Sequence, residues 1–357
     1  MKKVIVKSPG RICVLGEHQD YFNLPVISAA IDKYIVVEIE QKNDDICEIF
    51  CKDTNEYYKF RIDEIPLGYA HSRDYIRSVV NTVYKMGYFF KTGFKAVIYG
   101  DIPMKGGLSS SSALNVAFAS ALSYFNGERF LPPDKLALLG FTSEVLEFKE
   151  HGGMMDHISS AYGGIMHIDF SKTNPEITKL NIKNSDFIIA DSDEPKDTAI
   201  TGLAVIKSGV HRALEAAKEI LPDSNIHNIK IEQLDQIDSI TIKDRKLITG
   251  TLKTRDITAR GFDLLQSESV KPEEFGALIN EQHEVLRDYL EISTPKIERI
   301  INASIEKGAL GCKIIGSGGG GCVLIYAPGS IDKVKKSVIA SGGIPFDISI
   351  SKGTFCV

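Results

Sequence analysis

A glycine- and serine-rich segment at residues 106–115 is the part of the chain best suited to bind phosphate. It reads Gly-Gly-Leu-Ser-Ser-Ser-Ser-Ala-Leu-Asn. A strand pattern at 94–99 precedes it and apolar residues at helical spacing follow it from 113 to 122, so the segment is expected to open a helix. Unpaired backbone N–H groups and the positive end of the helix dipole attract anions at such a junction, and small residues let a polyphosphate approach them closely. The sequence therefore predicts a polyphosphate-binding loop.

The same segment has a simpler interpretation, in which Ser110 or Ser111 only caps the helix after a flexible turn. It fits neither of two common nucleotide motifs, because no Lys-Ser or Lys-Thr follows the glycines and the Gly-x-Gly-x-x-Gly spacing is absent. Its four serines could supply hydroxyl groups to phosphate oxygens or to a magnesium ion. The rest of the chain has to decide between the two interpretations.

A second group of polar residues lies between positions 8 and 21, which read Ser-Pro-Gly-Arg-Ile-Cys-Val-Leu-Gly-Glu-His-Gln-Asp-Tyr. We expect a short turn there that brings the cation Arg11 together with Glu17, His18 and Asp20. Carboxylates accept paired hydrogen bonds from neighbouring hydroxyls, so this group suits a polyhydroxyl ligand and disfavours analogues that lack those hydroxyls. A metal site is a weaker interpretation, because no His-x-x-x-His or similar spacing is present. A plain surface turn is the third.

Glycine dominates a third segment, residues 311–323, in which five of the six positions from 316 to 321 are Gly. Short apolar strand patterns lie on either side. So many glycines cost more backbone entropy on folding than a simple hairpin requires. We expect the backbone here to approach a ligand or another loop closely, although a glycine-rich hairpin would give a similar pattern.

Taken in this order, the three segments resemble the GHMP kinases, the family of galactokinase, homoserine kinase, mevalonate kinase and phosphomevalonate kinase. The phosphate loop of that family, Pro-x-x-x-Gly-Leu-x-Ser-Ser, is matched from Pro103 to Ser111, and its glycine-rich third motif is matched without a gap at 311–323. The resemblance covers nearly the whole chain. It implies an α+β protein of two lobes, with a ribosomal-protein-S5-like N-terminal α/β domain and a ferredoxin-like C-terminal α/β domain. It also implies the use of ATP and Mg2+.

Within the family, the chain is most similar to galactokinases. Their signature Gly-Arg-x-x-x-x-Gly-Glu-His-x-Asp-Tyr is present at 10–21, and their segment Cys-Gly-Ile-Met-Asp-Gln resembles 152–157. The departures are Cys13 for the usual Asn, Gln19 for the usual Thr, and a stretch at 22–27 that is closer to mevalonate kinases. The resemblance implies ATP-dependent phosphorylation of a monosaccharide, at the anomeric hydroxyl of galactose or a related sugar. A mevalonate kinase and an inactive sensor of sugar and nucleotide are the alternatives.

The resemblance also implies a role for each matched residue. Asp156 is expected to be the catalytic base and Arg11 its cationic partner. Ser111 and Glu144 are expected to hold magnesium, since Glu144 lies twelve residues before Asp156, as in galactokinases. The sugar pocket is expected to contain Glu17, His18, Asp20 and Gly153. The nucleotide is expected to contact Gly106, Gly107, Leu108, Ser109, Ser110, Ser111 and Gly318. The remaining histidines, His157 among them, show no spacing that indicates a role.

Length and composition agree with a two-domain enzyme. A chain of 357 residues exceeds one ordinary core, and we place the domains at 1–185 and 186–357. The chain is 43% hydrophobic and 25% charged with a net charge of −5, which is typical of a globular protein and does not suggest a nucleic-acid partner. The N-terminus lacks the apolar run of a signal peptide, and no stretch reaches membrane-spanning length. We therefore expect a cytoplasmic protein without a membrane partner, and the oligomeric state stays open.

Hydrophobic periodicity predicts the elements that must position these residues. Strands are expected at 4–6, 34–39, 94–99, 164–170, 187–190, 312–315 and 322–326. Helices are expected at 74–86, from 113 to 122, and at 132–149, 155–162, 202–220, 229–237, 243–264, 272–291 and 294–307. The six cysteines are scattered, so free thiols are expected rather than disulfides. Cys47 and Cys51 lack the second pair that would complete a metal site.

Overall fold

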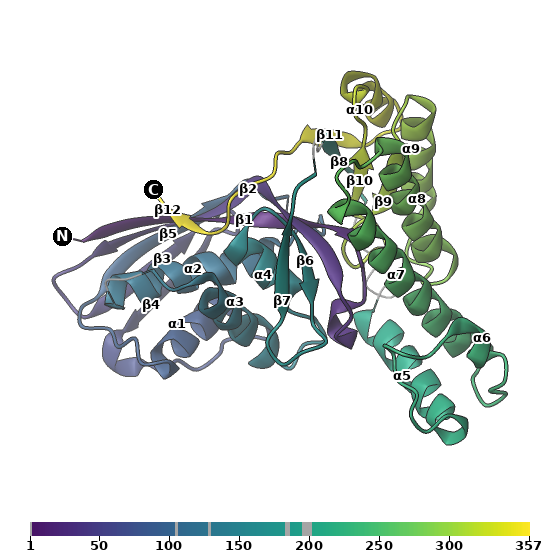
Figure 1. Ribbon diagram of the computed structural model, residues 1–357. Coiled ribbons are helices and arrows are strands. Elements are labelled where there is room, and N and C mark those ends of the chain that lie inside the picture. Colours follow the sequence, from purple (N-terminus) through teal and green to yellow (C-terminus); the bar gives the residue numbers. More distant parts are fainter. Residues whose placement is uncertain (1, 104–105, 128–129, 183–185, 195–201) are drawn as a thin grey trace.

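The computed structural model describes residues 2–103, 106–127, 130–182, 186–194 and 202–357, and it has two lobes (Figure 1). The first lobe is built on an eight-stranded sheet, in which the path β12-β1-β2-β5-β3-β4 is extended by β6, which pairs with β2 and β7. Among the described pairs, β3 with β5 is parallel and the others are antiparallel. The strands are β1 (Lys3–Leu15), β2 (Val26–Gln41), β3 (Ile46–Cys51), β4 (Glu56–Arg61), β5 (Phe94–Gly100), β6 (Ile165–Asp169), β7 (Glu176–Leu180) and β12 (Phe355–Cys356).

Helices cover one face of this sheet, with α2 at the centre of the layer (Figure 1). Helix α2 contacts β1 and β2 on one side and the neighbouring helices on the others, and it is rich in Ala and Ser. These small side chains let its neighbours pack closely from all directions, which explains why most of the helix is buried. The helical elements are α1 (Tyr75–Lys85), α2 (Ser110–Gly127), α3 (Pro133–Phe141), the π-helix η3 (Thr142–Leu146) and α4 (Met155–Tyr162).

The second lobe carries a four-stranded antiparallel sheet in the order β11-β8-β10-β9. Helices α8 and α9 pack on β9, α10 packs on β11, and α7 contacts both α5 and α8. The strands are β8 (Phe187–Asp191), β9 (Gly311–Ile314), β10 (Cys322–Tyr326) and β11 (Ile344–Asp347). The helices are α5 (Leu203–Ile220), α6 (Ile231–Leu234), α7 (Ile242–Gln266), α8 (Pro272–Asp288), α9 (Pro295–Glu306) and α10 (Ile331–Ala340).

The predicted α+β class and two-lobed arrangement are confirmed, with differences in individual elements. The predicted helix at 132–149 is an α-helix that ends at Phe141 and continues as the π-helical turn η3. The predicted helix at 229–237 is the short α6. The predicted domain boundary, between residues 185 and 186, falls at the segment 183–185, which lies outside the described residues.

Residues 8–15 continue strand β1, so the short turn expected between positions 8 and 21 is wrong for its first half. The strand crosses Pro9 and Gly10 with a shift of register against β2. Gly10 allows this course, because a Cβ there would lie 2.8 Å from the backbone oxygen of Leu108. Arg11 donates its backbone N–H to the same oxygen at 3.1 Å. Arg11 is therefore placed by a strand, and the turn begins only at Gly16.

The C-terminal segment leaves the second lobe and returns to the first (Figure 1, yellow). Ile350 bridges to Ile31, Lys352 bridges to Gly163, and β12 then pairs with β1 through Cys356 and Val6. The first sheet is thus completed by residues from the opposite end of the chain, and the second lobe lies between its strands in sequence.

The six cysteines are free thiols, as predicted. Cys47 and Cys51 are buried, and burial raises the pKa of each thiol to about 12. Neither is poised to ligate a metal. Across the described ranges, no helix combines the length and apolar character that crossing a membrane requires.

Candidate active site

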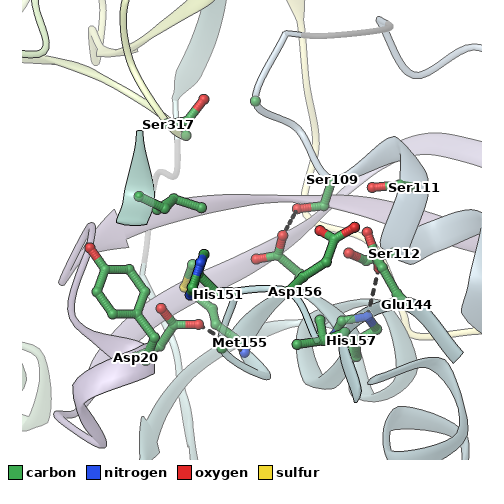
Figure 2. A pocket seen from close by; sticks show the side chains of 18 of the residues that line it. Asp20, Ser109, Ser111, Ser112, Glu144, His151, Met155, Asp156, His157 and Ser317 are labelled. Carbon is green, nitrogen blue, oxygen red and sulfur yellow. Dashed lines mark hydrogen bonds and ion pairs between the residues drawn. The ribbon is translucent and has the colours of Figure 1, made fainter. Parts of the chain in front are cut away.

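A cavity of about 970 Å³ is lined by residues from both lobes. The three segments singled out in the sequence meet around it, together with the start of α4 (Figure 2). The first residues of α5 also line the cavity. Asp156 lies near the middle of this view, with Ser109 and Ser111 on one side and Asp20 on the other. The cavity therefore has a serine-lined end and a carboxylate-lined end.

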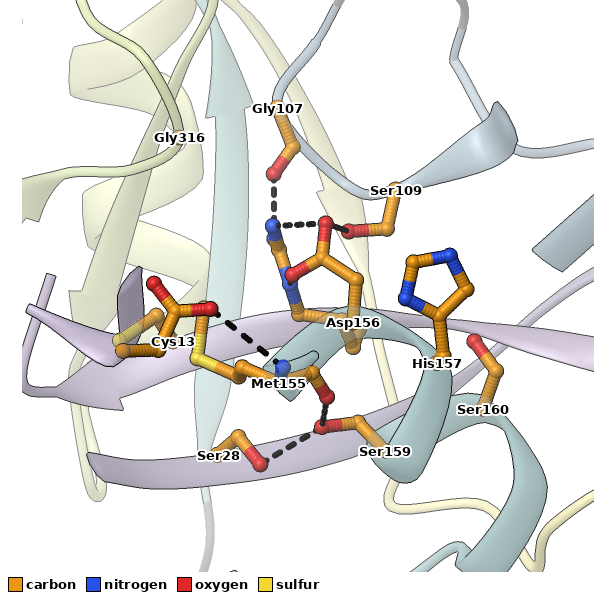
Figure 3. Close-up of polar contacts among 12 residues, drawn as sticks. Cys13, Ser28, Gly107, Ser109, Met155, Asp156, His157, Ser159, Ser160 and Gly316 are labelled. Atoms are coloured by element: carbon orange, nitrogen blue, oxygen red, sulfur yellow. Dashed lines mark hydrogen bonds and ion pairs between the residues drawn. The ribbon is translucent and has the colours of Figure 1, made fainter. Parts of the chain in front are cut away.

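Arg11 and Asp156, 145 residues apart in sequence, form a paired contact in the cavity. In Figure 3, Asp156 lies below Gly107 and Ser109 of the serine-rich loop. Arg11 Nε donates to Asp156 Oδ1 at 2.6 Å, and Nη2 donates to Oδ2 at 2.8 Å. The remaining terminal nitrogen, Nη1, donates to the backbone oxygen of Gly107 at 2.7 Å. Ser109 Oγ also donates to Asp156 Oδ2, at 2.6 Å. One guanidinium thus connects the strand β1, the helix α4 and the serine-rich loop.

The charge of Asp156 is set by two opposing effects. Burial raises the pKa of Asp156, but the charge of Arg11 and the hydrogen bonds from Arg11 and Ser109 outweigh it. The net pKa of Asp156 is below its ordinary value. Arg11 responds in the opposite sense: burial disfavours its charge, yet Asp156 holds its pKa above the ordinary value. Both side chains are therefore charged at neutral pH.

The serine-rich loop and the glycine-rich third segment contact each other backbone to backbone. A Cβ on Gly107 would lie 2.7 Å from the backbone oxygen of Ile315, and a Cβ on Gly316 would lie 2.7 Å from Gly107 Cα. Both glycines have positive φ, at 84° and 77°. Cys322 also donates its N–H to Gly106 O at 3.2 Å. The close approach expected of the third segment is to another loop.

Two residues expected to contact nucleotide lie away from the cavity wall. Gly106 faces Cys322 and the third segment, and Gly318 packs against Ile292, where a Cβ would lie 2.4 Å from Ile292 Cβ. Gly316 and Ser317 line the cavity in place of Gly318. The other expected residues of the loop, Gly107, Leu108, Ser109, Ser110 and Ser111, do line it.

Asp20 and Gly153 meet at the carboxylate-lined end. A Cβ on Gly153 would lie 2.2 Å from Asp20 Oδ2, so only glycine fits there. Asp20 Oδ2 accepts a long hydrogen bond from the backbone of Met155, at 3.4 Å. Burial and the nearby charge of Asp156 raise the pKa of Asp20 to about 6. Asp20 thus gains a proton more readily than Asp156 does.

Glu17 and His18 line the cavity but are also tied to the third segment. Lys313, fully buried on β9, donates to Glu17 Oε2 at 2.6 Å, and the backbone N–H of Gly316 donates to Glu17 Oε1 at 2.9 Å. The two ring nitrogens of His18 lie 3.2 Å from Tyr21 Oη and 3.1 Å from Gly316 O. These contacts hold the turn after β1 against the second lobe.

Ser111 and Glu144 lie on the serine-lined side of the cavity, on α2 and on the π-helical turn η3. A hydroxyl and a carboxylate are oxygen donors of the kind that Mg2+ prefers, and Mg2+ is commonly held by one or two carboxylates together with phosphates and water. In the described part of the chain, no cluster of three or more His, Cys, Asp or Glu side chains could hold a metal alone. Ser111 and Glu144 are thus oxygen donors of the type that Mg2+ prefers, and both line the same cavity.

Family models match the chain in three places. The model "GHMP kinases N terminal domain" matches residues 74–164, "GHMP kinases C terminal" matches 267–343, and "Galactokinase galactose-binding signature" matches 1–41. The chain belongs to the GHMP kinase family. Each model falls on a part of this GHMP kinase that lines the cavity or supports it.

Curated galactokinases align with this GHMP kinase over almost their whole length. That of Thermosipho africanus is 28% identical, covering 93% of this chain and 91% of its own, and that of Thermotoga petrophila is 28% identical, covering 97% and 96%. Lactococcus lactis galactokinase, solved in complex with galactose, has a TM-score of 0.87 at 20% identity, covering 99% of this chain and 95% of its own. Methanococcus jannaschii mevalonate kinase has a TM-score of 0.74 at 23% identity, covering 98% and 99%. These two structures share the fold.

Sequence reasoning missed several residues that shape the site. Lys313 had no signal beyond being a lone cation in an apolar strand pattern, and that pattern is what buries it against Glu17. His157 was given no role, yet its Nε2 lies 2.7 Å from Glu144 Oε2. Because His157 and Glu144 lie on different elements, no regular sequence spacing predicts their contact. Ser109 was assigned to the nucleotide, and in the structure its hydroxyl donates to Asp156.

Proposed function

We propose that this GHMP kinase is a galactokinase, which transfers the γ-phosphoryl group of ATP to the anomeric hydroxyl of galactose or a closely related sugar. The products are a sugar 1-phosphate and ADP. The observation that carries the proposal is the Arg11–Asp156 pair, which lies between an anion-binding loop and a buried carboxylate pocket in one cavity. The galactokinase relatives and the galactose-binding signature support the choice of sugar.

Phosphoryl transfer requires positioning and charge stabilisation more than covalent chemistry. Asp156 is the group that faces the acceptor hydroxyl: it orients that hydroxyl and receives its proton. Arg11 keeps Asp156 ionised and offsets the charge that develops on the transferred phosphoryl group. The backbone of the loop from Gly107 to Ser111, at the N-terminal end of α2, binds the phosphates of ATP.

The carboxylate-lined end supports a hydroxyl-rich acceptor. Asp20 accepts hydrogen bonds from neighbouring sugar hydroxyls, with Glu17 and His18 completing the pocket and Gly153 leaving room beside Asp20. A mevalonate kinase is disfavoured, because mevalonate offers Asp20 no hydroxyl-rich partner and because Arg11 stands where that branch carries Lys. A sugar sensor without activity is disfavoured, because Asp156 retains its cationic partner.

Mg2+ would be held by Ser111 and Glu144, and when bound it neutralises phosphate charge and orients the phosphoryl group. Glu144 is buried and lines the cavity. The galactokinase relatives support a role in carbohydrate metabolism, and a cytoplasmic location stays a prediction from the sequence.

A panel of acceptors tests the proposal. ADP release is measured with ATP and Mg2+ on galactose, other hexoses, sugar acids and mevalonate. Turnover on galactose or a close epimer is expected. Turnover only on mevalonate, or binding of sugar and nucleotide without ADP release, would replace the proposal with one of the alternatives.

A further inference from the structure

The buried contact between His157 and Glu144 is a feature of the cavity wall that the proposed function leaves without a role (Figure 2). His157 Nε2 lies 2.7 Å from Glu144 Oε2, and His157 is 1% exposed. A carboxylate oxygen is a hydrogen-bond acceptor, so we assign the donor role in this contact to the ring nitrogen. The other ring nitrogen, Nδ1, is buried without a hydrogen-bond partner within the described chain. Glu144 is thus the polar group to which this ring is tied.

Apolar packing fixes the direction in which the ring points. The ring of Phe141 meets that of His157 edge-on, with centroids 5.6 Å apart and an interplanar angle of 74°. On the neighbouring helix, a Cβ on Gly140 would lie 3.0 Å from His157 Cδ2 and 2.7 Å from Val116 Cγ2. The missing side chain at Gly140 leaves the space that the imidazole fills. The donor of His157 therefore has a defined position.

Hydrogen bonds through Asn115 connect the residue beside Glu144 to the backbone of Ser111. Ser143 Oγ donates to Asn115 Oδ1 at 2.8 Å, and Asn115 Nδ2 donates to the backbone oxygen of Ser111 at 2.9 Å. Ser143 and Glu144 belong to the π-helical turn η3, a type of turn that often occurs at functional sites. Asn115 therefore fixes the position of this turn relative to Ser111. His157 contacts the carboxylate of Glu144.

We propose that His157 is a positioning residue, which uses its Nε2–H to hold the Glu144 carboxylate in place for the Mg2+–nucleotide complex at Ser111. The inference rests on the proposed function. It gives α4 two tasks one residue apart, because Asp156 faces the acceptor and His157 orients the group that faces the metal. A partner that orients a metal-binding carboxylate typically changes metal affinity or activity by about 10- to 100-fold when it is removed.

The test compares His157→Leu, which removes the donor, with His157→Gln, whose amide nitrogen can donate from a similar position. Calorimetric titration with ADP at a series of Mg2+ concentrations gives the Mg2+ concentration at half-maximal binding. We expect this concentration to rise about 10-fold or more in His157→Leu and to stay within about threefold of wild type in His157→Gln. ADP affinity without Mg2+ and the KM for sugar should change little, because neither depends on Glu144.

A double variant separates positioning from general damage. In a Glu144→Ala background, His157→Leu should have no further effect on the Mg2+ dependence. His167→Leu is the control, because it removes another buried histidine, which stacks on Phe262 and does not line the cavity with Ser111 and Glu144. It should leave the Mg2+ dependence unchanged. If His157→Leu does not fold, His157→Phe keeps a ring without the donor.

The inference is overturned if a folded His157→Leu or His157→Phe variant has the Mg2+ dependence of the wild type. It is also overturned if His157→Leu changes the Mg2+ dependence as much in the Glu144→Ala background as in the wild type. Because the readout is nucleotide binding, the inference can be judged even if the wild-type protein phosphorylates no sugar. A wild-type protein that phosphorylates no sugar would reject the proposed function but not this inference.

Discussion

Asp156 is only partly buried and is ionised at neutral pH, and this combination defines how it can act. Its pKa lies below the ordinary value because Arg11 outweighs the effect of burial. A carboxylate of low pKa is a weak base at neutral pH, so orientation of the acceptor hydroxyl is its main contribution before bond formation. In the proposed reaction, Arg11 adds a positive charge next to the phosphoryl group that is transferred. The pair therefore acts as one unit in the proposed reaction.

Replacing Asp156 by Asn should lower turnover by about 100- to 10,000-fold, because the amide can neither accept the proton nor carry the charge that Arg11 complements. Steady-state ADP release at saturating galactose and ATP measures this. Binding of galactose by the variant, measured by calorimetry, is the control that the pocket is intact. Turnover close to wild type would remove Asp156 from the mechanism.

Asp20 should make sugar utilisation depend on pH near 6. Burial and Asp156 raise its pKa from 3.8 to about 6, so the free enzyme gains a proton at Asp20 as the pH falls through that value. The protonated group accepts fewer hydrogen bonds, and kcat/KM for the sugar should then fall about tenfold per pH unit below 6. Asp20→Asn should have a lower kcat/KM that no longer changes with this step. A wild-type profile that is flat from pH 5 to 7 would contradict the expectation.

For individual residues, the sequence identified which side chains gather in the cavity but only some of the contacts between them. The order of the motifs and the family resemblance were sufficient to name Arg11, Asp156 and Asp20. The contact of His157 with Glu144 depends on a π-helical turn, whose extra residue per turn alters the direction of each side chain that follows, and periodicity does not reveal such a turn. The partner of Glu17, Lys313, comes from the other lobe, and only the tertiary fold places it there.

Between elements, the serine-rich loop is supported by backbone contact with the third segment. The sequence predicted a close approach at 311–323, and the structure identifies the neighbour as the loop at Gly107. It did not predict that β1 runs on through Pro9 and Gly10, because these residues usually interrupt a strand. Strand β1 tolerates them through a shift of register and the space beside Gly10.

Gly107→Ala tests that support. The substitution places a Cβ 2.7 Å from Ile315 O and also forces alanine into a positive φ, so we expect weaker ATP binding and a loss of stability of about 2 kcal/mol or more. Gly329→Ala is the matched control, since Gly329 has a φ of 72° but no atom within 4 Å of the added Cβ. It should lose only about 1 to 2 kcal/mol and keep its ATP affinity. Denaturant unfolding measures the stability of each variant, and nucleotide titration measures its ATP affinity. Equal effects of the two substitutions on ATP affinity would contradict the idea that contact with the third segment supports the serine-rich loop.

On the scale of the whole molecule, the two lobes are joined by a buried ion pair. Lys313 is fully buried, and it donates to Glu17 and to the backbone oxygen of Cys13 at 2.9 Å. A buried pair adds little net stability over an apolar pair, but removal of one partner leaves an uncompensated charge. Both lobes also depend on this contact for the position of the turn that carries His18.

Lys313→Met should therefore destabilise the protein by about 3 to 5 kcal/mol, because Glu17 stays buried without its cation. The double variant Lys313→Met/Glu17→Gln should recover most of this loss, since no buried charge remains. The free energy of unfolding from denaturant titration gives both values. A double variant no more stable than Lys313→Met would show that the ammonium acts through its contact with Cys13 instead.

The return of residues 350–356 to the first sheet has a consequence for biosynthesis. A ribosome makes β12 more than 300 residues after β1, so the outer edge of β1 lacks its neighbouring strand throughout that interval. An open edge of this kind pairs readily with other polypeptides. Nascent or prematurely terminated chains should accordingly depend on chaperones, and production of the first lobe alone should yield inclusion bodies unless the closing segment is supplied with it.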